Sequence, residues 1–203
     1  MPKIYTIGHS NHTLDKFVEL LKEHQIDAVG DVRSSPYSAW LPHFNRETLK
    51  EALSRAGILY VFLGDELGAR RSESEAYNDK GVAEYGRIAR LSTFQEGLNR
   101  VLSGGSRYRL ALMCAEKDPL ECHRTILVVR ELRSRAVDVE HILEDGSLET
   151  QVAAEDRLMR EEKMPDSDLF ESKEGLLERA YLLRGGKIAY QESASNSSLA
   201  ATK

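Results

Sequence analysis

The chain has 203 residues, 41% of them hydrophobic, and a formal net charge of −5 at pH 7. This length predicts one main domain with a sizeable core. The sequence shows neither a long apolar run nor the basic, apolar start of a signal peptide, so we expect a cytoplasmic protein without a membrane partner. Because the excess of acidic residues lies entirely within 144–203, a polyanion such as DNA would have to bind a local basic patch.

The first half of the chain alternates predicted strands and helices. Strands are predicted over 3–8, 26–32 and 58–64, where β-branched and aromatic residues cluster. Between them lie a helix that begins after Thr13, a loop over 33–45 and a helix from Arg46 to about Ala56 that Gly57 ends. The spacing of apolar residues predicts a long helix from about Ile88 to the segment SGGS.

The second half continues the same alternation. Strands are predicted over 108–114 and 137–143, with a helix over 123–135 between them and further helices at about 150–163 and 174–184. The pattern predicts an α/β fold of the Rossmann-like kind, an open, mostly parallel sheet of about five strands with helices on both faces. We expect an α/β domain over 1–146, a helical C-terminal extension over 147–190 packed on it, and a disordered tail over 191–203.

Polar side chains follow four of the predicted strands. Ligands bind outside the carboxyl ends of the strands in open parallel sheets, so these residues are predicted to face one crevice. They are His9, Ser10, Asn11, Asp31, Arg33, Arg70, Arg71, Cys114, Glu116, His123 and Arg124.

The segment LMCAEKDPLECHR, residues 112–124, is compatible with several chemistries. A thiol phosphatase would place five residues between cysteine and arginine, whereas Cys114 and Cys122 lie ten and two positions before Arg124. Zinc is disfavoured because the neighbours Cys122 and His123 would not easily reach one ion, so we expect no metal and no cofactor. A polar site made by Glu116, His123 and Arg124 remains. The alternative is that Glu116 or Asp118 merely caps the next helix and that Arg124 pairs with one of them.

The loop after the second strand carries the other candidate residues. Asp31 is a carboxylate at the sheet edge, suited to a general base or to stabilising a cation. Tyr37 and Trp40 are placed to stack on a flat base, although packing against the core is the simpler explanation for each. Arg33, Arg70, Arg71 and Arg124 are candidates for phosphate contacts.

Several motifs resemble the bacterial and archaeal family named domain of unknown function 488. They are IYTIGHSN, VGDVRSSPYS, LGDELGARR, LMCAEKDPLECHR, VEHILEDG and GGKIAY. The resemblance covers residues 3 to about 146 together with the last motif. The activity that it implies is that of a DNA glycosylase removing methylated adenine.

The sequence permits this chemistry. Cleavage of an N-glycosidic bond needs a carboxylate near the cationic sugar and an acid near the departing base. Asp31 and Glu116 are predicted for these roles, with His123 as a donor. A non-catalytic nucleotide-binding or anion-binding module, and a thiol-dependent redox enzyme or phosphatase using Cys114 and Cys122, are the alternatives. The oligomeric state stays open.

Overall fold

A computed structural model of the chain describes residues 3–191. Its centre is a six-stranded sheet in the order β3-β2-β4-β1-β5-β6. All neighbouring strands pair in parallel except β5 and β6, which pair antiparallel. The strands are β1 (Lys3–Gly8), β2 (Ala28–Asp31), β3 (Leu59–Phe62), β4 (Leu110–Cys114), β5 (Asp138–Ile142) and β6 (Leu148–Thr150).

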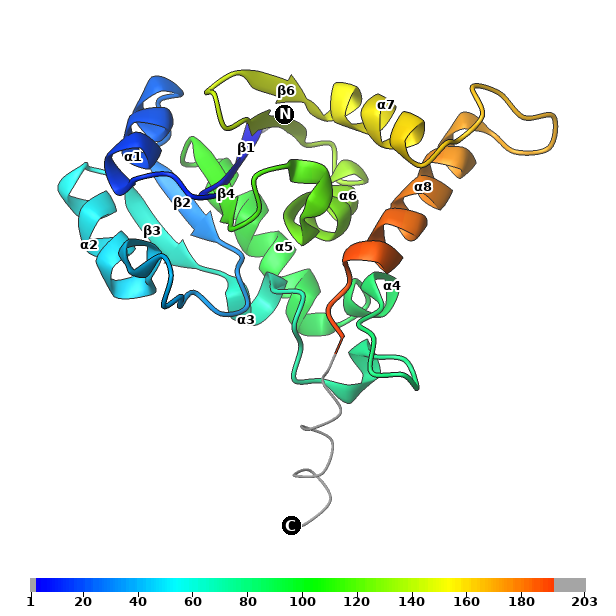
Figure 1. Ribbon diagram of the computed structural model, residues 1–203, viewed down its shortest axis with the longest axis horizontal. Coiled ribbons are helices and arrows are strands. Elements are labelled where there is room, and N and C mark those ends of the chain that lie inside the picture. The colour runs from blue at the N-terminus through cyan, green and yellow to red at the C-terminus, as the bar shows by residue number, and fades with distance from the viewer. Residues whose placement is uncertain (1–2, 192–203) are drawn as a thin grey trace, which may run out of the picture.

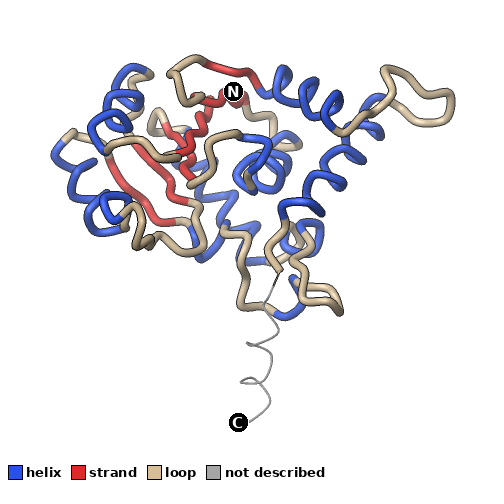
Figure 2. The backbone as a smooth tube through the Cα atoms, viewed as in Figure 1, coloured by secondary structure: helices blue, strands red, loops and turns tan. Residues whose placement is uncertain are grey.

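Helices flank this sheet on both sides (Figures 1 and 2). The α-helices are α1 (Leu14–Glu23), α2 (Arg46–Arg55), α3 (Gly64–Leu67), α4 (Tyr85–Ile88), α5 (Ser92–Gly105), α6 (Arg130–Arg133), α7 (Gln151–Glu161) and α8 (Lys173–Ile188). Short 3₁₀ turns lie at η1 (Pro42–Phe44), η2 (Ser74–Ala76) and η3 (Pro119–Glu121), and a π-helical segment, η4 (Arg124–Val129), leads into α6. Within residues 3–191, no helix is long and apolar enough to cross a membrane.

Alternation along the strands divides the core into two clusters. In β4, Ala111 and Met113 pack toward α1 and α2, whereas Leu112 and Cys114 pack toward α5, η4 and α8. The second cluster includes Tyr181 of α8, so the C-terminal helices share the core of the α/β layers. The predicted α/β class, open sheet and helices on both faces are therefore confirmed.

Local signals in the sequence explain where several helices begin and end. The hydroxyl of Thr13 accepts from the backbone N–H of Lys16 at 3.2 Å and so caps α1. Gly57, just after α2, has φ +77°, a conformation that favours glycine. Asn45 precedes α2 but its side chain accepts instead from the N–H of Ser38, which fastens the preceding loop.

Three features differ from the sequence predictions. The expected long helix is two helices, α4 and α5, and Gly97 in α5 allows close packing, because a Cβ there would lie 2.8 Å from Leu67. The short β6 adds an antiparallel edge strand within the region predicted to be only helical. The tail predicted to be disordered lies, from residue 192 on, outside the described residues; Gln191 forms an isolated bridge with Val82.

Candidate functional site

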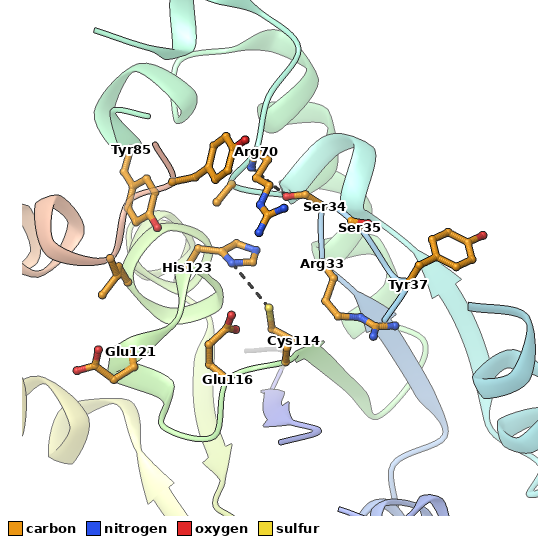
Figure 3. A pocket seen from close by; sticks show the side chains of 14 residues that line it. Arg33, Ser34, Ser35, Tyr37, Arg70, Tyr85, Cys114, Glu116, Glu121 and His123 are labelled. Carbon is orange, nitrogen blue, oxygen red and sulfur yellow. Dashed lines mark hydrogen bonds between the residues drawn. The ribbon is translucent and has the colours of Figure 1, made fainter. Parts of the chain in front are cut away.

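A pocket of about 390 Å³ opens at the carboxyl ends of β2 and β4 (Figure 3). This is the edge at which open parallel sheets bind ligands. Six residues predicted from the sequence line it: Arg33, Tyr37, Arg70, Cys114, Glu116 and His123. The other seven predicted residues, His9, Ser10, Asn11, Asp31, Trp40, Arg71 and Arg124, are not among its lining residues.

Four side chains converge at one end of this pocket, and we call them the floor cluster: Cys114, Glu116, Cys122 and His123. Figure 3 shows His123 and Glu116 directed toward Cys114. The Sγ of Cys122 donates to Glu116 Oε2 at 2.8 Å. His123 Nδ1 lies 3.7 Å from Cys114 Sγ and 4.0 Å from Cys122 Sγ. We expected that Cys122 and His123 would not easily reach one ion. Their donor atoms nevertheless lie within 4.8 Å of each other, because Cys122 is extended (φ −136°, ψ 138°) and His123 is helical.

The loop between β4 and η4 is fixed by its own polar groups. The carboxylate of Asp118 accepts from the N–H of Leu120 at 2.8 Å and caps the turn that Pro119 begins. Arg124 is fully buried, and its guanidinium donates to the carbonyl oxygens of Glu116 and Lys117 at 2.6 and 3.1 Å. The guanidinium of Arg124 thus contacts the loop backbone, and neither the Glu116 nor the Asp118 carboxylate is its hydrogen-bond partner.

Burial and mutual charge shift the pKa values in the floor cluster. Burial, then the negative charge of Cys122, raises the pKa of Glu116 above its usual range. Burial and a hydrogen bond to Cys122 raise the pKa of Cys114. Burial opposes ionisation of Cys122 too, but Cys114, Arg124 and His123 outweigh it and lower the Cys122 pKa. Burial likewise opposes protonation of His123, but contacts with Cys122 and Glu116 raise its pKa. The pKa of each group in the cluster therefore depends on the charges of its neighbours as well as on its own burial.

Asp31 lies behind the pocket, where it holds Arg33. Its carboxylate is fully buried and accepts from Arg33 Nε at 2.9 Å, from Nη2 at 2.7 Å and from the hydroxyl of Tyr60 at 2.7 Å. Arg33 also donates to the carbonyl of Phe44 at 3.0 Å and lies 3.3 Å from His9 Nε2. With its oxygens engaged, Asp31 has the geometry of a positioning residue, which differs from the predicted general base.

Burial, then the charge of Arg33, lowers the pKa of His9 to about 4. Its ring is neutral at pH 7 and stacks on Phe44 with 4.2 Å between ring centroids. His9 Nδ1 donates to the carbonyl of Ser10 at 2.9 Å, and the Ser10 hydroxyl donates to Asn11. These three predicted residues interact with one another at the end of β1, and His9 is the one that contacts Arg33.

The two neighbouring arginines Arg70 and Arg71 have different surroundings. Arg70 is exposed at the pocket, with its guanidinium 4.7 Å from the ring centroid of Tyr190. Arg71 is buried and donates to two carbonyls of α3, to Glu73 at 2.6 Å and to Thr93 at 2.8 Å. The prediction that Arg71 contacts phosphate is not supported by this geometry, because its donors are used within the chain.

The two aromatic residues of the 33–45 loop lie outside the pocket centre. Tyr37 lines the pocket rim, and Figure 3 shows its ring pointing away from the floor cluster. Its hydroxyl donates to Glu47 at 2.9 Å. Trp40 is 92% exposed and is not a lining residue, so the two rings do not form the base sandwich predicted inside the pocket.

Eight of the 14 lining residues were not among the predicted site residues, and those with aromatic or acidic side chains are Tyr85, Glu121 and Tyr190. Tyr190 reaches the pocket because α8 ends beside it and the carbonyl of Tyr190 accepts from the N–H of Ala83 at 2.9 Å. The motif GGKIAY contains Tyr190 and was the available signal. Tyr85 and Tyr190 both line the pocket, so they supply aromatic surface there, whereas Trp40 does not line it and the ring of Tyr37 points away from the floor cluster (Figure 3).

Fold and site together define an open-sheet α/β protein with a polar pocket at the carboxyl edge of its strands. The family described as domain of unknown function DUF488 matches residues 13–130, more than half of the chain, and the chain belongs to this family. No curated protein matches the chain significantly, and neither does any solved structure.

Proposed function

We propose that the pocket binds a nucleotide unit of DNA and hydrolyses its N-glycosidic bond, with methylated adenine as the base released. The observation that carries the proposal is the position of Glu116, a carboxyl group that lines a polar pocket beside aromatic rings and an exposed arginine. A volume of about 390 Å³ lies within the range of small-molecule sites, roughly 300–1,000 Å³.

In this proposal each lining group has a chemical task. Tyr85 and Tyr190 present apolar ring surface to a flipped base, and Arg70 contacts the phosphate next to it. Glu116 accepts a proton from the attacking water while the oxygen bonds to the sugar. The glycosidic bond breaks with its electron pair going to the base, which then receives that proton.

The negative charge of ionised Glu116 also stabilises the cationic sugar as the bond breaks. Arg33 lines the pocket in an orientation fixed by Asp31, so Asp31 acts through Arg33. Of the four arginines predicted to contact phosphate, Arg70 alone is exposed. The proposed contact with DNA is therefore narrow, in keeping with the acidic composition of the chain.

The test is mass spectrometry of small molecules released from duplex DNA that contains N6-methyladenine. Wild-type protein is expected to release the free base, and Glu116→Gln is expected to slow release by about 10²–10⁴-fold. Glu121→Gln is the matched control, because Glu121 lines the same pocket but pairs with Arg184 at 2.7 Å. Equal rates for the two variants would remove Glu116 from the reaction, and saturable nucleotide binding without release would make the pocket a binding site only.

A further inference from the structure

We propose that Cys114, Cys122 and His123 bind one zinc ion at the floor of the pocket, with Glu116 beside its open coordination position. The side-chain donor atoms of these four residues all lie within 4.8 Å of one another. Thiolate and imidazole together are the ligand set that favours zinc among the common divalent ions. The inference concerns the same pocket but does not rest on the N-glycosidic reaction.

The distances are already close to those of a tetrahedral site. Zinc–sulfur bonds of about 2.3 Å and zinc–nitrogen bonds of about 2.05 Å place sulfur and nitrogen ligands about 3.6 Å apart. His123 Nδ1 lies 3.7 Å from Cys114 Sγ and 4.0 Å from Cys122 Sγ. These two nitrogen–sulfur distances exceed the tetrahedral value by only about 0.1 and 0.4 Å.

Hydrogen bonds outside the three ligands hold them in the required form. His123 Nε2 lies 2.9 Å from the carbonyl oxygen of Val32. A carbonyl only accepts, so Nε2 carries the hydrogen and a neutral ring directs the Nδ1 lone pair toward the sulfurs, as in most metal-binding histidines. The backbone N–H of Arg124 donates to Cys122 Sγ at 3.4 Å, so a donor outside the ligand set helps to fix this sulfur.

The fourth position faces the pocket. Cys114, Glu116 and His123 all line it, so an ion bound here would be open to water and to a ligand (Figure 3). Glu116 Oε2 lies 2.8 Å from Cys122 Sγ and is therefore adjacent to the ion. Three protein ligands with water in the fourth position define a catalytic type of zinc site, and a neighbouring carboxylate can take the proton of that water.

The experiment measures metal binding directly. Reduced full-length protein, stripped with a chelator and then dialysed against zinc, is assayed for bound zinc by elemental analysis. Cobalt(II) is titrated in parallel, because thiolate ligands give sulfur-to-cobalt charge-transfer absorption. We expect one zinc ion per chain and that absorption. His123→Asn and Cys122→Ser are expected to weaken binding by at least about 100-fold, while His43→Asn, a change at another half-buried histidine, leaves it unchanged.

Wild-type protein that retains no stoichiometric zinc and gives no charge-transfer band would overturn the proposal, and this result does not depend on whether any variant folds. Circular dichroism checks the fold of each variant. Glu116→Gln is expected to keep zinc affinity within about 10-fold, and a loss as large as that of His123→Asn would refute the open position. Bound zinc without base release would reject only the proposed hydrolysis of the N-glycosidic bond. Base release by protein that binds no zinc would reject only the proposed zinc site.

Discussion

Replacing Asp31 with asparagine tests whether this carboxylate holds Arg33. The substitution preserves size but removes the charge that faces a buried guanidinium. Breaking one partner of a buried ion pair costs about 3–5 kcal/mol, and the weakened bond from Tyr60 adds to that. Because the free energy of unfolding of a domain is about 5–15 kcal/mol, Asp31→Asn is expected to lose at least about a fifth of the stability.

Urea unfolding followed by circular dichroism at pH 7 measures this loss. A double-mutant cycle with Arg33→Gln separates the pair from other effects. The double variant is expected to be more stable than the sum of the two single losses predicts, by at least about 1.5 kcal/mol. A loss below about 1 kcal/mol for Asp31→Asn, or simple additivity in the cycle, would refute the positioning role.

Three further predictions concern residues outside the floor cluster. Burial lowers the pKa of His141 to about 4, so its contribution to stability is complete above pH 6.5 and is lost as the pH falls toward 4. Wild-type protein should lose about 2 kcal/mol more than His141→Gln between pH 7 and pH 5 in urea unfolding, and parallel curves would contradict this. Gly8→Ala should destabilise the protein by about 1–3 kcal/mol or more and abolish base release, because the added Cβ would lie 1.9 Å from the Glu116 carbonyl oxygen. Unchanged stability would show that the loop after β4 can move away at little cost. Gly186→Ala in α8 meets no atom within 4 Å and should be neutral or stabilising by up to about 1 kcal/mol, so a lower unfolding midpoint would contradict the described packing.

The fold was predictable because its signals are local. Apolar strands, the Thr13 cap and the Gly57 stop depend on neighbours a few residues away, and all three have their predicted structural roles. The edge strand β6 was not predicted because three residues are too few to show the alternation of polar and apolar residues that marks a strand. The break between α4 and α5 depends on contacts that a helical spacing of apolar residues does not report.

The site was only partly predictable, because side-chain partners are set by contacts between distant segments. The polar strand ends pointed to the correct edge of the sheet, and Glu116, His123 and Arg70 do line the pocket. However, an aspartate at a strand end looks the same in sequence whether it faces a ligand or, as Asp31 does, a tyrosine 29 positions away. Likewise, the side chains of Cys122 and His123 converge because the two residues have different backbone angles, and these angles cannot be read from the sequence.

The most direct test of the proposed function follows oxygen from water during reaction with duplex DNA containing N6-methyladenine. In oxygen-18-labelled water, hydrolysis of the N-glycosidic bond is expected to yield unlabelled free base, one abasic site for each base released, and the label on the sugar. Glu116→Gln should suppress all three signals together. Bound DNA with no released base, or label found in the base in place of the sugar, would contradict N-glycosidic hydrolysis in this pocket.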